Sequence, residues 1–364
     1  MILTLEEQAL LKLLQAALWN IRPKAACFSD LSDKMWQNIH KLSVKQGVQA
    51  LVLDGIALLP DNIQPPKNLK INWAVNVKLI EVRYEHNQQT LIQLSKLYRK
   101  ENIPIMLLKG LATASCYPIP AHRESGDIDI WLFGNHSKGN KVMADIGKSI
   151  HNFDEKHSCS YFNGIPIENH IKFLNETRFH IDQQIETALN QILKEESYET
   201  MHLGKENIII PPTTFNAMFN ARHMTTHLPR ELVLRHLCDW ARFLYTYSGK
   251  YNTEKFIQIF EKTNMMSTIG ILTQICIDYL GLPSKYIPFA IVNNTKLEER
   301  ILTDVLHTKN SNPQHKCIVK RFLWKCERFF NEQWKYQLLY KENIIMRLAR
   351  SVMWHYRNSR SLFI

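Results

Sequence analysis

The chain has 364 residues, of which 45% are hydrophobic, and a formal net charge of +11. This length allows two or three packed regions. No apolar run approaches the roughly 18 residues that a membrane-spanning helix requires, so a soluble globular protein is expected. Only 12 glycines occur, which favours a helix-rich fold. The first ten residues carry two acids where a signal peptide would carry basic residues, so a cytoplasmic protein is expected.

Two features of composition bear on partners and metals. The seven cysteines are scattered and include no Cys-x-x-Cys pair, which argues against a disulfide framework and against a cysteine-based zinc site. The segment 316–360 carries eleven Lys or Arg and three Glu, a net charge of +8. This basic segment could contact nucleic acid, anionic lipid or an acidic protein, or it could be a solvated helix face.

Residues 1–100 are predicted to form an N-terminal helical region. Thr4 and Glu7 form a capping-box pattern, followed by apolar residues at helical spacing. Further helices are predicted over Asp33–Gln46 and Val48–Leu59, and a long helix carries an apolar stripe from Trp73 to Tyr98.

Residues 101–211 are predicted to form an α/β core, because short apolar runs replace the helical periodicity. Asn163-Gly164 between two strand-like runs is a strong hairpin signal. Helices are expected over 138–150 and 181–193. The predicted strands are Ile103–Leu108, Gly126–Phe133, Lys156–Phe162, Ile165–Phe173 and Asn207–Pro211.

Residues 212–364 return to helical patterns, including Leu232–Tyr245 and Lys316–Trp354. The predicted fold class is therefore α+β, with a small mixed sheet between two helical regions.

The most informative stretch is the Asp127-Ile128-Asp129 element inside an apolar run. Side chains alternate along a strand, so the two carboxylates share one face. Two adjacent carboxylates on a buried strand repel each other and are costly to desolvate. The pair makes physical sense if it binds a divalent cation, which indicates metal-assisted phosphoryl chemistry.

A third carboxylate is expected from the hairpin. Glu168 and His170 share a face of its second strand, and Glu168 could bring another oxygen ligand to the same cations. His170 could orient a carboxylate, bind substrate or act as a base.

The corner formed by Lys109 and Gly110 comes at a predicted strand-to-helix turn. A glycine there lets backbone N–H groups approach an anion, and the lysine adds a point charge suited to phosphate. Arg123 lies four residues before Asp127 and could reach the same nucleotide.

In this order, Lys109-Gly110, Arg123, Asp127-x-Asp129 and Glu168-x-His170 resemble the uncharacterised nucleotidyltransferase family of the polymerase-β-like superfamily. The resemblance implies a five-stranded or similar mixed sheet, an NTP substrate and two Mg²⁺ (or Mn²⁺) ions held by Asp127, Asp129 and Glu168. It also implies transfer of an NMP group with release of pyrophosphate.

A helical segment, Leu234 to Arg242, resembles the family's Arg-x-x-x-Asp-x-Ala-Arg segment and suggests nucleotide contacts for Arg235 and Asp239. Arg235, Asp239 and Arg242 lie on one helical face and could instead form ion pairs within their helix. The sequence departs from the superfamily pattern at Leu111, where a second small residue usually follows the glycine.

Two rival functions stay open from the sequence. One is a LicD-like phosphocholine transferase, which also uses paired acids. The other is a non-catalytic nucleotide- or nucleic-acid-binding protein that uses the basic C-terminal region. His223 and His227 are spaced for a metal pair, but no Glu follows His223, so a structural or substrate-facing role is preferred. The acceptor, whether small molecule, glycan or protein, is not indicated by any motif.

Overall fold

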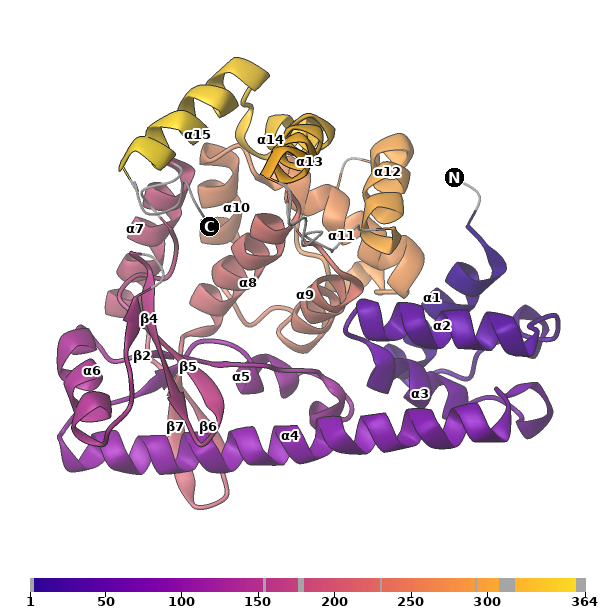
Figure 1. The fold of residues 1–364 in the computed structure, drawn as a ribbon, viewed down its shortest axis with the longest axis horizontal. Coiled ribbons are helices and arrows are strands. Elements are labelled where there is room, and N and C mark those ends of the chain that lie inside the picture. The colour runs from indigo at the N-terminus through magenta and orange to yellow at the C-terminus, as the bar shows by residue number, and fades with distance from the viewer. Residues whose placement is uncertain are drawn as a thin grey trace.

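The computed structural model describes residues 3–152, 155–175, 180–229, 231–291, 293–307 and 318–357. It confirms the α+β class, with one mixed sheet and helices before and after it in the chain (Figure 1). No helix among these residues is long and apolar enough to cross a membrane.

Helix α1 packs against α2 and α3, and α3 packs against α4. The predicted capping box of α1 is confirmed: Thr4 accepts from the Glu7 amide, and Glu7 accepts from the Thr4 amide. Figure 1 shows α4 running across the lower part of the view, from below the other N-terminal helices to the sheet, where the β6–β7 hairpin extends past it. These four helices are α1 (Leu5–Trp19), α2 (Asp33–Lys45), α3 (Gln49–Ala57) and α4 (Lys67–Lys100).

Seven strands form the sheet in the order β3-β4-β5-β2-β1-β7-β6. The pairs β2/β5 and β1/β7 are parallel, and the other neighbouring pairs are antiparallel. The strands are β1 (Met106–Leu107), β2 (Ile128–Trp131), β3 (His151–Asn152), β4 (His157–Phe162), β5 (Ile165–His170), β6 (Glu199–Leu203) and β7 (Glu206–Ile210).

The β4–β5 hairpin is confirmed, with Asn163 and Gly164 both at positive φ in its turn. The resemblance implied a five-stranded or similar mixed sheet, and the mixed sheet has seven strands, with β3 and β6 at its edges. The run predicted from Ile103 to Leu108 contributes only Met106–Leu107 to the ladder. Three helices connect the strands: α5 (Leu111–Ala114), α6 (His136–Asp145) and α7 (His180–Glu195).

The C-terminal part is helical, as predicted. The long helical stretch expected over Lys316–Trp354 is divided, and Lys341 ends α14 in the left-handed conformation. The helices are α8 (Thr213–His227), α9 (Leu234–Thr246), α10 (Thr253–Lys262), α11 (Met266–Leu280), α12 (Thr295–Leu306), α13 (Ile318–Asn331), α14 (Gln333–Tyr340) and α15 (Ile344–Arg357).

Two hydrophobic cores meet along α4. Trp73 and Val77, in its first half, belong to the larger core, which joins the N-terminal and C-terminal helices. Leu91, Leu94 and Tyr98, in its second half, belong to the core under the sheet. The sheet, which carries the acidic residues, is thereby fixed relative to the helical part of the molecule.

Candidate active site

Three carboxylates converge on the centre of the sheet. Asp127 directly precedes β2, Asp129 lies on β2, and the parallel register places Glu168 of β5 opposite Asp129. One oxygen of each carboxylate lies within 4.8 Å of the others. The structure thus brings together the three acidic residues predicted from the sequence. Their spacing is suitable for carboxylate oxygens that bind a divalent cation.

The two oxygens of Asp129 have different surroundings. Oδ1 lies 3.2 Å from the Lys109 Nζ atom and 3.0 Å from the His170 Nε2 atom. Oδ2 is buried and has no hydrogen-bond partner. A buried carboxylate oxygen without a partner is costly, and a bound cation would remove that cost. Asp129 therefore presents one oxygen that is held in place and one that is available to a metal.

The pKa values of the two aspartates diverge. Burial would raise the pKa of Asp129, but the charge of Lys109 and the hydrogen bond from His170 outweigh it and lower the pKa. Burial and the neighbouring charge of Asp129 raise the pKa of Asp127. Burial opposes the charged form of Lys109, yet Asp129 and Asp127 hold its pKa above the usual value. The site is therefore an unequal carboxylate pair beside a permanent cation.

Gly110 makes the corner between β1 and α5 possible. Its φ of 70° and ψ of −105° are strained for any residue with a side chain, and an added Cβ would lie 3.3 Å from the Ser125 Oγ atom. Because α5 has only four residues, its dipole offers little to an anion. Phosphate binding at this corner would therefore depend on Lys109 and on backbone amides.

Arg123 and Asp239 form a bidentate ion pair. The Arg123 Nε and Nη2 atoms donate to the two Asp239 oxygens at 3.0 and 2.7 Å, and the Tyr117 hydroxyl donates to the same carboxylate at 2.6 Å. Burial would raise the pKa of Asp239, but Arg123 lowers it. This pair fastens the segment before β2 to α9, and the nucleotide contacts suggested for Arg123 and Asp239 stay predictions.

Arg235 has a different environment from Arg123. Its Nη1 atom donates to the Glu124 carbonyl oxygen at 3.0 Å, and it forms no ion pair with the residues that the structure describes. Burial and the neighbouring charge of Arg123 lower its pKa. The structure does not show the ion pairs within α9 that the sequence left open for Arg235, Asp239 and Arg242. Among the described residues, Asp239 pairs with Arg123 instead, and Arg235 and Arg242 donate to backbone carbonyl oxygens.

His170 is buried between two acceptors. Its Nδ1 atom lies 3.1 Å from the Lys172 carbonyl oxygen, and its Nε2 atom lies 3.0 Å from Asp129 Oδ1. The ring satisfies both only when each nitrogen carries a proton. His157, opposite His170 in the hairpin register, lies 3.5 Å from a Glu168 oxygen. The sequence reasoning missed His157, although the hairpin register around Asn163-Gly164 would have placed it there.

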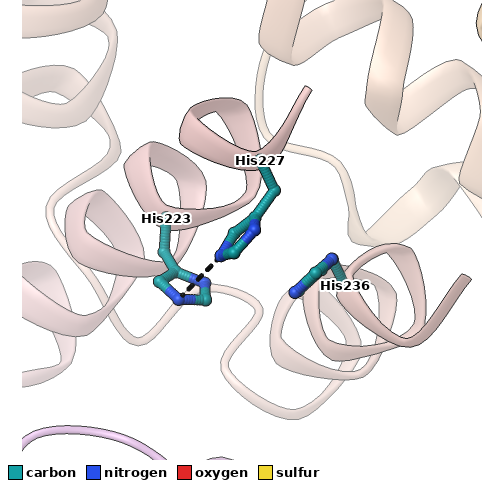
Figure 2. A group of neighbouring side chains, drawn as sticks. All are labelled: His223, His227 and His236. Atoms are coloured by element: carbon teal, nitrogen blue, oxygen red, sulfur yellow. Dashed lines mark hydrogen bonds between the residues drawn. The ribbon is translucent and has the colours of Figure 1, made fainter. Parts of the chain in front are cut away.

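A histidine cluster stands behind Lys109. Figure 2 shows His223 and His227 of α8 and His236 of α9 turned toward one another. The Nε2 atoms of His223 and His227 are 3.3 Å apart, and the His227 and His236 rings stack at 4.1 Å. The Lys109 ammonium lies 3.4 Å from the His223 Nε2 atom. Sequence reasoning did not connect α8 to the acidic strand, because the contact depends on tertiary packing.

The histidine cluster is better explained as a set of uncharged, packed imidazole rings than as a metal site. The Val233 amide donates to His236 Nδ1 at 3.2 Å, so a neutral His236 carries its proton on Nε2 and offers no lone pair there. His223 Nε2 already faces the Lys109 ammonium. Burial first, and then the charge of Lys109, lowers the pKa of His223 well below its usual value. Burial likewise lowers the pKa of His236.

Comparison with known proteins gives one family. The family described as "Uncharacterised nucleotidyltransferase" matches residues 32–281, more than half of the chain. No curated protein matches the chain. Among solved structures, an antigenic nucleotidyltransferase-like protein from Paracoccidioides brasiliensis is similar, with 10% identity and a TM-score of 0.30 over 53% of this chain and 92% of the other.

Proposed function

Because the chain belongs to the uncharacterised nucleotidyltransferase family, we propose that it transfers an NMP group from an NTP to a hydroxyl-bearing acceptor and releases pyrophosphate. The observation that supports this most directly is the group of Asp127, Asp129 and Glu168, with one buried Asp129 oxygen lacking a partner. A group with that geometry is suited to phosphoryl chemistry assisted by a divalent cation.

The residues fit a hard cation such as Mg²⁺ or Mn²⁺, since all three ligands offer carboxylate oxygen. Asp127, Asp129 and Glu168 would hold it. When bound, such an ion neutralises triphosphate charge and makes the acceptor hydroxyl more acidic.

The remaining roles belong to side chains around the carboxylates. Lys109, with its raised pKa, stays charged and binds the triphosphate beside the Gly110 turn. His170 fixes the orientation of Asp129 through the 3.0 Å contact to Oδ1. Glu168 is the more exposed partner of its pair with buried Asp129, so it can meet the incoming acceptor.

The proposed step is an in-line displacement. The acceptor oxygen forms a bond to the α-phosphorus, the bond from that phosphorus to the bridging oxygen of the β-phosphate breaks, and pyrophosphate leaves with the electron pair. Glu168 accepts the hydroxyl proton. Positioning and electrostatics would supply most of the rate acceleration.

The test uses Asp129→Asn, which keeps the size of the side chain but removes its charge. We expect Mg²⁺-dependent pyrophosphate release to fall by on the order of 100-fold or more, with an unchanged circular dichroism spectrum. Each NTP, labelled at the α-phosphate, is incubated with the protein, Mg²⁺ or Mn²⁺ and cell extract. The labelled product then identifies the acceptor as a small molecule, a glycan, a protein or a nucleic acid.

The matched control is Asp145→Asn on the exposed side of α6, which should behave as the wild type. Pyrophosphate release at the wild-type rate in Asp129→Asn would contradict the proposed function. Salt-sensitive nucleotide or nucleic-acid binding that is indifferent to Asp129→Asn, without any turnover, would instead favour the non-catalytic binding protein.

A further inference from the structure

A cavity of about 750 Å³ is lined by residues up to Gly126, the neighbour of Asp127 in the chain, although none of the three carboxylates lines it. Its wall includes Glu124, Ser125 and Gly126, the segment that leads into Asp127. The Ser125 hydroxyl donates to the Asp127 carbonyl oxygen at 3.3 Å. Gly126 and Asp127 are consecutive, so their Cα atoms are about 3.8 Å apart. A ligand in this cavity would therefore lie next to the Asp127 end of the site.

The cavity is distinct from the corner expected to hold the triphosphate. Neither Lys109 nor Gly110 lines it. His227 and His236 do line it, and His223 joins the same cluster to Lys109 on the other side. The histidine cluster thus separates the cavity from Lys109.

Three cations on the cavity wall form no close ion pair with a carboxylate of the described residues: Lys45, Arg83 and Arg235. Lys45 and Arg83 are exposed, whereas Arg235 is half-buried and its guanidinium donates to the Glu124 carbonyl oxygen. Arg123 also lines the cavity, but Asp239 neutralises it. Because the carbonyl oxygen that Arg235 contacts carries no net charge, the guanidinium can still form a strong ion pair with an anionic ligand.

Two acids also face the cavity. Glu231 is exposed, and Glu124 has a buried Oε1 atom without a hydrogen-bond partner. Burial raises the pKa of Glu124, which weakens its compensation of Arg235 and Arg83. The balance on the wall is therefore positive. The remaining wall includes apolar side chains, among them Leu79 and Ile80 of α4 and Val233.

From this arrangement we infer that the cavity binds the acceptor, and that the acceptor is a small organic phosphomonoester. This inference rests on the proposed function. A phosphomonoester carries roughly −1.5 to −2 charges near pH 7 and offers three acceptor oxygens, which suits Arg235 with Arg83 and Lys45 at its edge. Its organic part would pack on Leu79 and Ile80, and its free hydroxyl would point toward Asp127.

The test measures binding by calorimetry without NTP and without divalent cation, so it is independent of turnover. The probes are inorganic phosphate, ribose 5-phosphate and ribose. We expect the wild type to bind ribose 5-phosphate at least about 10-fold more tightly than ribose, because the surplus cations recognise the phosphate. Arg235→Gln and Arg83→Gln should each remove most of this preference, and Arg99→Gln, on the exposed side of α4, should keep it.

Arg83 is exposed, so its substitution will not compromise folding even if Arg235→Gln does. Three results overturn the inference: no wild-type preference for the phosphorylated probes, equal affinity in Arg83→Gln, or full displacement of ribose 5-phosphate by a non-hydrolysable ATP analogue. The last would assign the cavity to the nucleotide. Binding of ribose 5-phosphate with no NTP turnover under any condition would contradict the proposed function and the acceptor role of the cavity, and would leave a phosphomonoester-binding site.

Discussion

Asp129 divides its two oxygens between protein and ligand. Lys109 and His170 hold Oδ1, and burial keeps water from Oδ2. A carboxylate fixed in this way loses little freedom when it binds a cation, which is the usual advantage of hydrogen bonds behind metal ligands. The position of this side chain is therefore set before any substrate arrives.

His170→Ala should weaken the use of Mg²⁺ without removing the carboxylates. Loss of the 3.0 Å contact frees Asp129 to rotate, and the Mg²⁺ concentration for half-maximal pyrophosphate release should rise roughly 10- to 100-fold. His170→Gln, which retains a donor, should recover part of the loss. His86→Ala, on the exposed side of α4, is the control. An unchanged Mg²⁺ requirement in His170→Ala would show that His170 does not orient Asp129.

The sequence predicted the contacts between site residues that lie close together in the chain or on one hairpin. Strand alternation placed Asp127 and Asp129 together, and the hairpin placed Glu168 with His170. The pairing of Arg123 with Asp239 joins residues 116 positions apart, and no local pattern encodes it. The contact of Lys109 with His223 spans 114 positions and depends equally on tertiary packing.

Among the elements, α8 and α9 bring the imidazoles of His223, His227 and His236 into one cluster, and burial disfavours the charged form of His223 and His236. Burial lowers the pKa of His223 and of His236 well below the usual 6.5. Between those lowered values and 6.5 the unfolded chain binds more protons than the native protein, so stability rises with pH in this window. Acidification below pH 6.5 should therefore loosen the junction of α8 and α9.

His236→Gln should reduce this pH dependence. Glutamine at the third helical position can still accept from the Val233 amide, so the cap is retained while the titrating ring is removed. On acidification below about pH 6.5, the wild-type free energy of unfolding should fall by up to about 1.4 kcal/mol per pH unit more than that of the variant. Urea unfolding at several pH values measures this. Parallel curves for His236→Gln and the wild type would contradict it, and His202→Gln on β6 is the exposed control.

The two edge strands, β3 and β6, were not predicted from the sequence. β3 pairs only two residues, His151 and Asn152, too few for any periodicity. β6 has only one buried residue and is a strand because β7 pairs with it across the Gly204 turn. By contrast, the central strands β5, β2, β1 and β7 each carry at least two apolar residues and fall largely within the runs that the sequence predicted as strands.

At the scale of the whole molecule, one buried arginine joins three distant segments. Arg242 of α9 donates from Nε to the Cys116 carbonyl oxygen at 2.7 Å and from Nη1 to the Leu18 carbonyl oxygen at 2.6 Å. Its guanidinium also lies over the Trp19 and Tyr245 rings. It thus connects the end of α1, the segment after α5 and the C-terminal helices.

Arg242→Met should destabilise the protein by about 2–4 kcal/mol, because two buried carbonyl oxygens lose their donors. Arg99→Met, which removes a solvent-exposed partner of Glu206, should cost at most about 1 kcal/mol. Urea unfolding monitored by circular dichroism measures both. Equal losses in the two variants would mean that Arg242 contributes no more than a surface charge.

The long helix α4 has a mechanical consequence. Its 34 residues contain neither proline nor glycine, so it is a continuous rod of roughly 51 Å at 1.5 Å per residue. One half is anchored in each hydrophobic core, and the middle, at Leu79 and Ile80, borders the cavity. A movement of the larger helical core relative to the core under the sheet would therefore require α4 to bend. The helix couples the positions of the two cores.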